Sequence, residues 1–192
     1  MIVYNFVQIK SKHKRMIEIL LEKIIQESTQ NNLFFLWGMP CSGKSTIGKQ
    51  LAAQLGYIFI DLDEYIMSKE NKTIAQIFQD NGEAFFRMME THYLNGIIIE
   101  NAKENINKKI IIATGGGTPC FNENRFEMLL NGFCIFLDVD LNMLIMRIQD
   151  DTKNIRPLFI DKTNEEISEL IFNFYQKRVP YYEKAHFNLK FA

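Results

Sequence analysis

The sequence is poor in cysteine, and its three cysteines follow no recognisable spacing. Cys41, Cys120 and Cys134 are scattered along 192 residues, without a CxxC pair or a cysteine–histidine pattern of the kind that holds zinc. An odd number of dispersed cysteines argues against a disulfide framework and against a metal cage. It indicates reduced thiols, and we therefore expect a cytoplasmic protein.

An excess of charge of one sign is also missing. The 22 lysines and arginines nearly balance the 23 aspartates and glutamates, which gives a formal net charge of -1 and an isoelectric point near 6.3. Nothing in this balance indicates a nucleic-acid partner. No apolar run is long enough to cross a bilayer, and the N-terminal stretch carries its charges after its apolar residues, so we expect no membrane partner.

The sequence contains no internal repeat, low-complexity tract or interdomain linker. With 192 residues, of which 47% are hydrophobic, it has the size of one ordinary domain. We expect residues 33–192 to form this domain, and residues 1–32 to form an N-terminal extension with one amphipathic helix over residues 14–28. The apolar stripe of that helix consists of Ile17, Leu20, Leu21, Ile24 and Ile25.

Short apolar runs alternate with helical patterns along the rest of the chain. Residues 33–37, LFFLW, directly precede a glycine-rich loop, which is typical of a central parallel strand that is buried on both faces. A helix is predicted from Lys44 to about Leu55, where Gly56 closes it. The other strand candidates are residues 57–61, 109–114, 133–138 and 186–191. Strands that alternate with helices indicate an α/β fold with a parallel sheet.

Two capping boxes mark further helix starts. Each pairs a threonine with a glutamine or glutamate three residues later, so that both side chains can bind backbone N–H groups of the first turn. Thr73 with Gln76 predicts a helix from about residue 74, and Thr163 with Glu166 predicts one from about residue 164.

A phosphate-binding loop is the clearest local motif. Its nine residues are Gly38, Met39, Pro40, Cys41, Ser42, Gly43, Lys44, Ser45 and Thr46. In such a loop the backbone N–H groups and the start of the next helix hold anionic oxygens, the lysine adds a positive charge, and the serine hydroxyl can bind Mg²⁺. The alternative is a plain glycine-rich turn with an exposed lysine. The order of strand, loop and helix favours phosphate binding.

Two aspartates follow the second strand candidate. If the chain remains extended there, Asp61 and Asp63 project to the same side, roughly 6 to 7 Å apart. One carboxylate could then meet a metal and the other a substrate. Alternatively, either aspartate simply caps a helix that begins near Glu64.

Three arginines and a glycine triplet complete the polar motifs. Arg87 and Glu90 stand three apart on one helix face, where the carboxylate can orient the guanidinium or form an ordinary surface pair. The triplet at residues 115–117 follows a strand candidate and lets a small polar ligand approach the backbone closely. Arg156 lies in a polar stretch at about 150–163 that suggests a lid, and Arg178 follows near a helix end. Each could be an ordinary solvated cation. Beside a phosphate loop, they become candidates for charge stabilisation and for a carboxylate clamp.

The order of these motifs resembles the shikimate kinase family. Across residues 38–182 they run as P-loop, DxD, GE-x-x-FR-x-x-E, GGG, RPL and KR-x-P-x-Y. The resemblance implies a nucleoside-monophosphate-kinase-like fold with a five-stranded parallel sheet of order 2-3-1-4-5. It also implies ATP-dependent phosphorylation of the shikimate 3-hydroxyl with Mg²⁺ as cofactor, a step of chorismate and aromatic amino acid biosynthesis. The rival interpretations are a related small-molecule kinase, such as a gluconate kinase, and a non-catalytic nucleotide-binding regulator.

The resemblance also assigns the chemical roles around the phosphate. It implies that Lys44 neutralises the transferring phosphoryl group, that Ser45 binds the metal, and that Asp61 holds the metal itself or a metal-bound water. Asp63 would face the reacting hydroxyl. Arg156 would come from the lid and contribute a second positive charge to catalysis and to nucleotide binding.

The same resemblance assigns the shikimate side of the site, within a substrate-binding region at about 62–90. Arg87, supported by Glu90, and Arg178 would bind the carboxylate from two sides. Apolar walls and the backbone that faces the ring hydroxyls would come from Phe78, Phe86, Gly115, Gly116 and Gly117.

The sequence departs from the family in two places. Most members have a glycine where Cys41 stands, so cysteine either strains the loop, gives a reactive thiol, or is tolerated, and we favour tolerance. Members usually continue past the last strand into an adenine-contacting loop and a final helix, whereas the printed sequence ends at Ala192. We expect the helix at 14–28 to cover the sheet surface that such a helix covers, in a monomer. The alternative is that its stripe forms a dimer.

Overall fold

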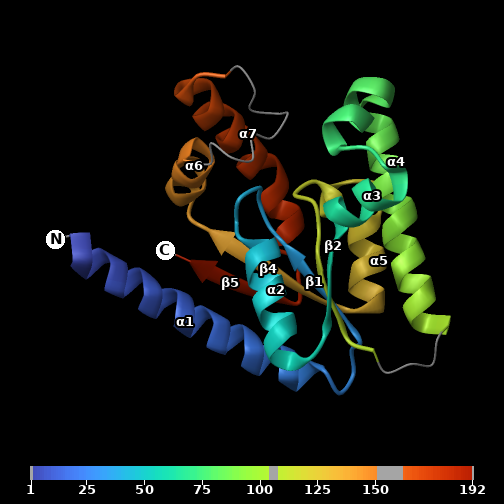
Figure 1. The fold of residues 1–192 in the computed structure, drawn as a ribbon, viewed down its shortest axis with the longest axis horizontal. Helices are drawn as coiled ribbons and strands as arrows, with labels where there is room; N and C mark the ends of the chain where they lie inside the picture. The colour runs from blue at the N-terminus through green and yellow to red at the C-terminus, as the bar shows by residue number, and fades with distance from the viewer. Residues whose placement is uncertain (1, 104–107, 151–161, 192) are drawn as a thin grey trace.

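Five short apolar strands pair in parallel into one sheet of order β2-β3-β1-β4-β5 (Figure 1). The computed structural model describes residues 2–103, 108–150 and 162–191. The elements in chain order are α1 (Ile2–Glu27), β1 (Leu33–Trp37), α2 (Lys44–Leu55), β2 (Ile58–Asp61), α3 (Leu62–Glu70), α4 (Ile74–Lys103), β3 (Ile110–Ala113), the 3₁₀ helix η1 (Thr118–Cys120), α5 (Asn124–Asn131), β4 (Phe133–Val139), α6 (Leu141–Asp150), α7 (Asn164–Tyr182) and β5 (Phe187–Phe191). The predicted fold class and strand order are confirmed.

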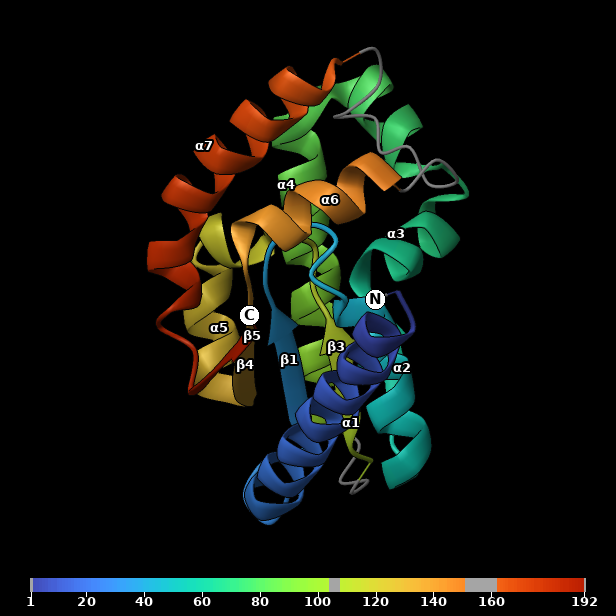
Figure 2. The same ribbon diagram turned by 90° about the vertical axis from the view of Figure 1, so that its left-hand side faces the viewer.

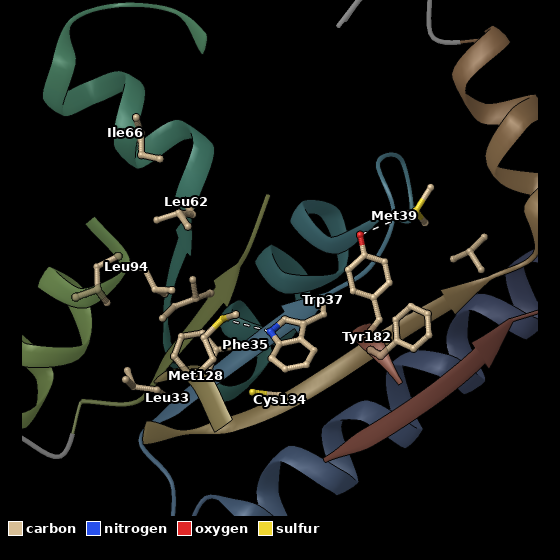
Figure 3. Packing of buried hydrophobic residues seen from close by; sticks show 14 of the residues in the cluster. Leu33, Phe35, Trp37, Met39, Leu62, Ile66, Leu94, Met128, Cys134 and Tyr182 are labelled. Carbon is tan, nitrogen blue, oxygen red and sulfur yellow. Dashed lines mark hydrogen bonds between the residues drawn. The ribbon is translucent and has the colours of Figure 1, made fainter. Parts of the chain in front are cut away.

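The central strand β1 is buried on both faces, as its continuous apolar sequence predicts. Phe34 and Leu36 belong to one hydrophobic cluster, while Phe35 and Trp37 belong to the cluster on the opposite face, because successive side chains of a strand alternate. Trp37 also satisfies its indole N–H inside the second cluster, where Nε1 lies 3.3 Å from the sulfur of Met128 (Figure 3). Helices therefore have to cover both faces of the sheet.

Helices α1 and α2 cover the first of these faces. Figure 2 shows α1 crossing in front of β1, with α4 behind the sheet. Leu20 and Ile24 of α1 are fully buried against strand side chains such as Phe34 and Leu137. The predicted docking of the N-terminal helix onto the sheet is confirmed.

The extent of α1 and one member of its stripe were predicted wrongly. The helix begins at Ile2 rather than near residue 14, because the apolar stripe marks only its packed part and a nucleated helix extends at little cost. Ile25, predicted to be buried, is 55% exposed, since it lies at the edge of the stripe, whereas Ile24 next to it is completely covered.

Helices α3 to α7 contribute to the second cluster, which surrounds Phe35 and Trp37. Both capping boxes form. Thr73 and Gln76 exchange hydrogen bonds of 2.8 and 3.2 Å at the start of α4, and Thr163 and Glu166 do so with 2.7 and 3.2 Å at the start of α7. No described helix is long and apolar enough to span a bilayer.

The entry to β5 depends on a neutral histidine. Nδ1 of His186 accepts a hydrogen bond from the backbone N–H of Cys134 at 3.0 Å, and the imidazole stacks on Phe133 with ring centroids 5.2 Å apart. Burial lowers the pKa of His186 below its ordinary value, although Glu27 acts in the opposite direction. A protonated Nδ1 could not accept this hydrogen bond.

We expect His186 to make stability depend on pH near neutrality. Because its pKa is lower in the folded protein, the unfolded chain binds the proton first as the pH falls below about 6.5, and stability decreases through that window. The melting temperature, measured between pH 8 and pH 5.5, should fall less in His186→Asn, whose side-chain oxygen can still accept a hydrogen bond. Equal pH dependence in both proteins would exclude this role of His186.

Candidate active site

The loop after β1 has the backbone geometry of a phosphate cradle. Gly38 and Gly43 have φ values of 149° and 93°, which favour glycine, and Gly43 leads directly into α2. A side chain at Gly38 would meet Leu137 O at 2.9 Å. Cys41 also has a positive φ, 61°, so this cysteine is in the left-handed region, at a cost of roughly 1 to 2 kcal/mol. Of the interpretations of Cys41, strain is therefore favoured over simple tolerance.

Lys44 is not the exposed lysine of a plain turn. Its side chain is nearly buried, and Nζ donates to the carbonyl oxygens of Gly38 and Met39 at 3.0 and 2.8 Å, and to Oγ of Ser42 at 3.3 Å. The ammonium group therefore lies inside the curve of the loop, where a bound phosphate oxygen could replace one of these acceptors.

The side chains of Ser45, in the first turn of α2, and Asp61, at the end of β2, form a hydrogen bond. The Ser45 hydroxyl donates to Oδ2 of Asp61 at 2.5 Å, while Oδ1 accepts the backbone N–H groups of Asp63 and Glu64 at 3.1 and 3.3 Å. Asp61 thus caps α3 and presents its other oxygen to Ser45. Both alternatives for this residue, the cap and the metal-facing group, are compatible with the geometry.

The extended aspartate pair was predicted wrongly. Helix α3 begins at Leu62, so Asp63 lies in the first helical turn instead of two residues along a strand. The cap at Asp61 is the physical reason, since its carboxylate satisfies two N–H groups that a new helix leaves without a partner. As a result, Asp61 faces the loop, and Asp63 is directed to the glycine triplet.

The glycine triplet is the point where the predicted substrate residues meet. A Cβ built on Gly115 would lie 3.0 Å from Oδ1 of Asp63, one on Gly116 would lie 3.3 Å from Nη1 of Arg178, and one on Gly117 would lie 2.6 Å from Nη1 of Arg87. Residues from α3, α4 and α7 therefore converge on this segment after β3, and the absence of side chains on it leaves room for them.

Arg87 is held by two carboxylates. Its Nη1 lies 2.5 Å from Oε2 of the fully buried Glu90, and its Nη2 lies 2.9 Å from Oε1 of Glu83. Burial of the guanidinium disfavours its charge, but Glu90 and Glu83 outweigh this effect, so the pKa of Arg87 is raised above its ordinary value. Glu90 binds Arg87 from the protein interior. The alternative of an ordinary surface ion pair between Arg87 and Glu90 is therefore excluded.

The second predicted arginine lies across the same segment. The guanidinium of Arg178 is 4.2 Å from the centre of the Phe174 ring. Burial raises the pKa of the nearby Cys120 to about 11, while Arg178 and Arg87 act in the opposite direction. Arg178 and Arg87 lie next to consecutive glycines, Gly116 and Gly117, so both guanidinium groups face the same short segment.

The two predicted apolar side chains form one contact. Phe78 and Phe86 have ring centroids 4.8 Å apart, and Phe86 is almost fully buried. Arg156 and nearly the whole predicted lid lie outside the described residues.

Three residues that sequence reasoning left without a role belong to this site. The Tyr182 hydroxyl donates to the carbonyl of Gly116, and Thr118 Oγ1 donates to Glu90 at 2.6 Å. Arg147 Nη1 donates to the Cys41 carbonyl at 3.1 Å. Tyr182 stands in the KR-x-P-x-Y motif and Thr118 directly follows the triplet, which were the available signals, whereas no pattern marked Arg147.

Comparisons with known proteins agree with this arrangement. The family model described as shikimate kinase matches residues 40–190. The shikimate kinase of Bacteroides fragilis is 37% identical over 153 residues, which cover 80% of this chain and 81% of the relative. The chain belongs to the shikimate kinase family.

Solved structures of shikimate kinases have the same fold. The enzyme of Bacteroides thetaiotaomicron superposes with a TM-score of 0.75 at 34% identity, over 82% of this chain and 85% of that one. The Acinetobacter baumannii shikimate kinase, determined in complex with shikimate, gives a TM-score of 0.74 at 30% identity, over 85% of each chain.

Shikimate kinases use ATP, generally with a divalent metal. Among the parts of the chain that the structure describes, no group of three or more His, Cys, Asp or Glu side chains could hold a metal ion by itself. The oxygens of Ser45 and Asp61 still fit Mg²⁺, because this ion commonly takes one or two protein oxygens and completes its shell with phosphate and water.

Proposed function

We propose that this protein transfers the γ-phosphoryl group of ATP to the 3-hydroxyl of shikimate, giving shikimate 3-phosphate and ADP. The observation that carries the proposal is the convergence of Asp63, Arg87 and Arg178 on the glycine triplet. Two arginines suit a carboxylate, and a nearby aspartate suits a hydroxyl. A nucleotide-binding regulator would need neither, and family membership agrees with the kinase.

The proposed reaction depends on position and charge. The bond between the γ-phosphorus and its bridging oxygen to ADP breaks, and a bond from the shikimate 3-oxygen forms through a loose transition state. Lys44 neutralises charge on the phosphate oxygens, and the backbone N–H groups at the start of α2 hold them. Mg²⁺, held by Ser45 and Asp61, would neutralise further phosphate charge.

Asp63 has the proton-handling role in this proposal. Its carboxylate aligns the 3-hydroxyl with the phosphorus and accepts the hydroxyl proton late in the transfer, for which an ordinary carboxylate basicity suffices. Arg87 and Arg178 hold the substrate carboxylate at the other end of the ring, so the hydroxyl stays at a defined distance from the phosphate. The role of Arg156 as a cation from a lid stays a prediction.

Acceptor specificity tests the proposed function directly. The wild-type chain, supplied with ATP and Mg²⁺, should release ADP with shikimate, and much more slowly with quinate or gluconate, in a coupled assay. Turnover with gluconate instead would identify the related small-molecule kinase. Nucleotide binding without ADP release with any of the three acceptors would indicate the non-catalytic regulator.

Substitution of either clamp arginine should weaken shikimate binding and leave ATP binding nearly unchanged. Arg87→Ala and Arg178→Ala each remove a charge-assisted pair with the carboxylate, on the order of 1.5 to 3 kcal/mol, so the shikimate dissociation constant should rise roughly 10- to 100-fold in calorimetric titrations. Arg15→Ala, an exposed arginine on α1, is the control. A variant that binds shikimate like wild type would remove that arginine from the clamp.

A further inference from the structure

The guanidinium of Arg87 lies near two aromatic rings as well as two carboxylates. Its central carbon lies 4.4 Å from the centre of the Phe121 ring and 5.3 Å from that of Phe86. Glu83 and Glu90 bind its N–H groups. The rings restrain the guanidinium without using any N–H group, so they leave for a substrate carboxylate the N–H groups that Glu83 and Glu90 do not take.

One short segment, Thr118–Asn122, supplies several of these restraints from outside α4. Thr118 Oγ1 donates to Oε1 of Glu90, whose other oxygen accepts from Arg87. Phe121 stacks on the guanidinium. Asn122 Nδ2 donates to the backbone carbonyl of Arg87 at 3.1 Å and to Oγ1 of Thr91 at 3.2 Å. The segment thus contacts the side chain of Arg87, the Glu90 carboxylate that binds this side chain, and the Arg87 backbone.

The backbone of this segment is held in an unfavourable conformation. Asn122 and Glu123 are consecutive residues with positive φ, 49° and 60°, and neither is glycine. Helix α5 follows directly, and its N-cap residue, Glu123, makes no side-chain capping hydrogen bond, while the Asn122 amide is directed across to α4. Strain of this kind is typical of functional sites.

The exposure of Phe121 also distinguishes it from a core residue. The ring is 38% exposed, although it packs on a guanidinium that is mostly buried. A ring in this position adds little to the core but excludes water from one face of Arg87, which strengthens the interaction of that cation with a bound anion.

We propose that Thr118, Phe121 and Asn122 are positioning residues that set the orientation of Arg87 and thereby the affinity for the substrate carboxylate. The inference rests on the proposed function, since it deepens the role of Arg87 as one arm of the clamp. These three residues lie in the segment Thr118–Asn122, which follows the glycine triplet, and they couple the triplet to α4, so the backbone that faces the substrate ring and the arginine that binds its carboxylate move together.

Phe121→Leu and Thr118→Val in the full chain test the proposal. Leucine keeps an apolar side chain but removes the ring face, and valine keeps the shape of threonine but removes the hydroxyl. Each variant should raise the dissociation constant and the KM for shikimate about tenfold, with the KM for ATP and kcat changed less than about threefold. Thr118→Ser, which restores the hydroxyl, should return the wild-type value.

Phe126→Leu is the matched control, because Phe126 is an exposed ring that stacks on a different arginine, Arg125, at 4.6 Å. It should leave shikimate affinity unchanged. A merely structural role of Phe121 would lower the melting temperature and alter ATP and shikimate parameters together. Wild-type shikimate affinity in both Phe121→Leu and Thr118→Val would overturn the proposal.

A double-mutant cycle separates this inference from the proposed function. If Phe121 acts through Arg87, Phe121→Leu should have almost no further effect on shikimate affinity in an Arg87→Ala background. Additive effects would show that Phe121 acts independently and would overturn the positioning role, while the clamp remains. Normal shikimate binding by Arg87→Ala would instead refute the clamp, and with it the role of the segment.

Discussion

Lys44→Ala and Asp63→Asn should both lower kcat severely in a folded protein, with different effects on nucleotide binding. Loss of the lysine removes charge stabilisation from the phosphoryl group, for which about a 100- to 1,000-fold decrease is expected. Loss of the carboxylate removes the group that aligns the hydroxyl and accepts its proton, for which the expected decrease is roughly 100- to 10,000-fold.

The two variants should differ in ATP affinity. Lys44 lies within the phosphate loop, so Lys44→Ala should also raise the ATP dissociation constant, whereas Asp63 lies at the glycine triplet and its substitution should leave ATP binding nearly unchanged. Steady-state kinetics, nucleotide titrations and melting curves measure these quantities. Wild-type turnover by Asp63→Asn would remove Asp63 from the mechanism.

The largest stability effect is expected on the face of the sheet that α1 covers. Leu20→Ala and Ile24→Ala each remove a fully buried side chain and should each destabilise the protein by about 2 to 5 kcal/mol, measured by denaturant unfolding. Ile25→Ala, one residue further along the same helix, is the control and should change stability by less than about 0.5 kcal/mol, because Ile25 is exposed.

The same three variants address the role of α1 in association. If the helix packs only within one chain, all three proteins should sediment as the wild type does, provided they are folded. Dissociation of a wild-type dimer by Ile25→Ala would support the alternative in which an exposed edge of α1 contacts a second chain. Deleting residues 1–30 should give a less stable or aggregating protein, since it exposes the sheet face around Phe34 and Leu137.

Lys23 shows how closely α1 is joined to the sheet. Its ammonium lies 2.7 Å from Glu27 on the same helix and 5.4 Å from the centre of the Phe133 ring at the start of β4. The sequence indicated the amphipathic face of this helix but not the cationic contact, because the spacing of apolar residues carries no information about which strand a charged neighbour meets.

Most of the fold was predictable because its signals are local. The LFFLW run of β1, the capping boxes of α4 and α7 and the closure of α2 by Gly56 depend on residues a few positions apart, and the structure has all of them. The order of the sheet was available only through the resemblance to shikimate kinases. The prediction of an extended chain after β2 was wrong, because the local sequence is compatible both with a strand that continues through Asp61 and with a cap of α3 at Asp61.

The sequence by itself determined which chemical groups are available and in what order, namely the phosphate loop, the two aspartates, the glycine triplet and the arginines. Only the tertiary structure decided how they are held. Glu90 bonds Thr118 across 28 positions, and Asn122 reaches Arg87 across 35. Such pairs leave no periodic pattern, because they arise when separate helices pack on one sheet and bring their side chains to the same edge.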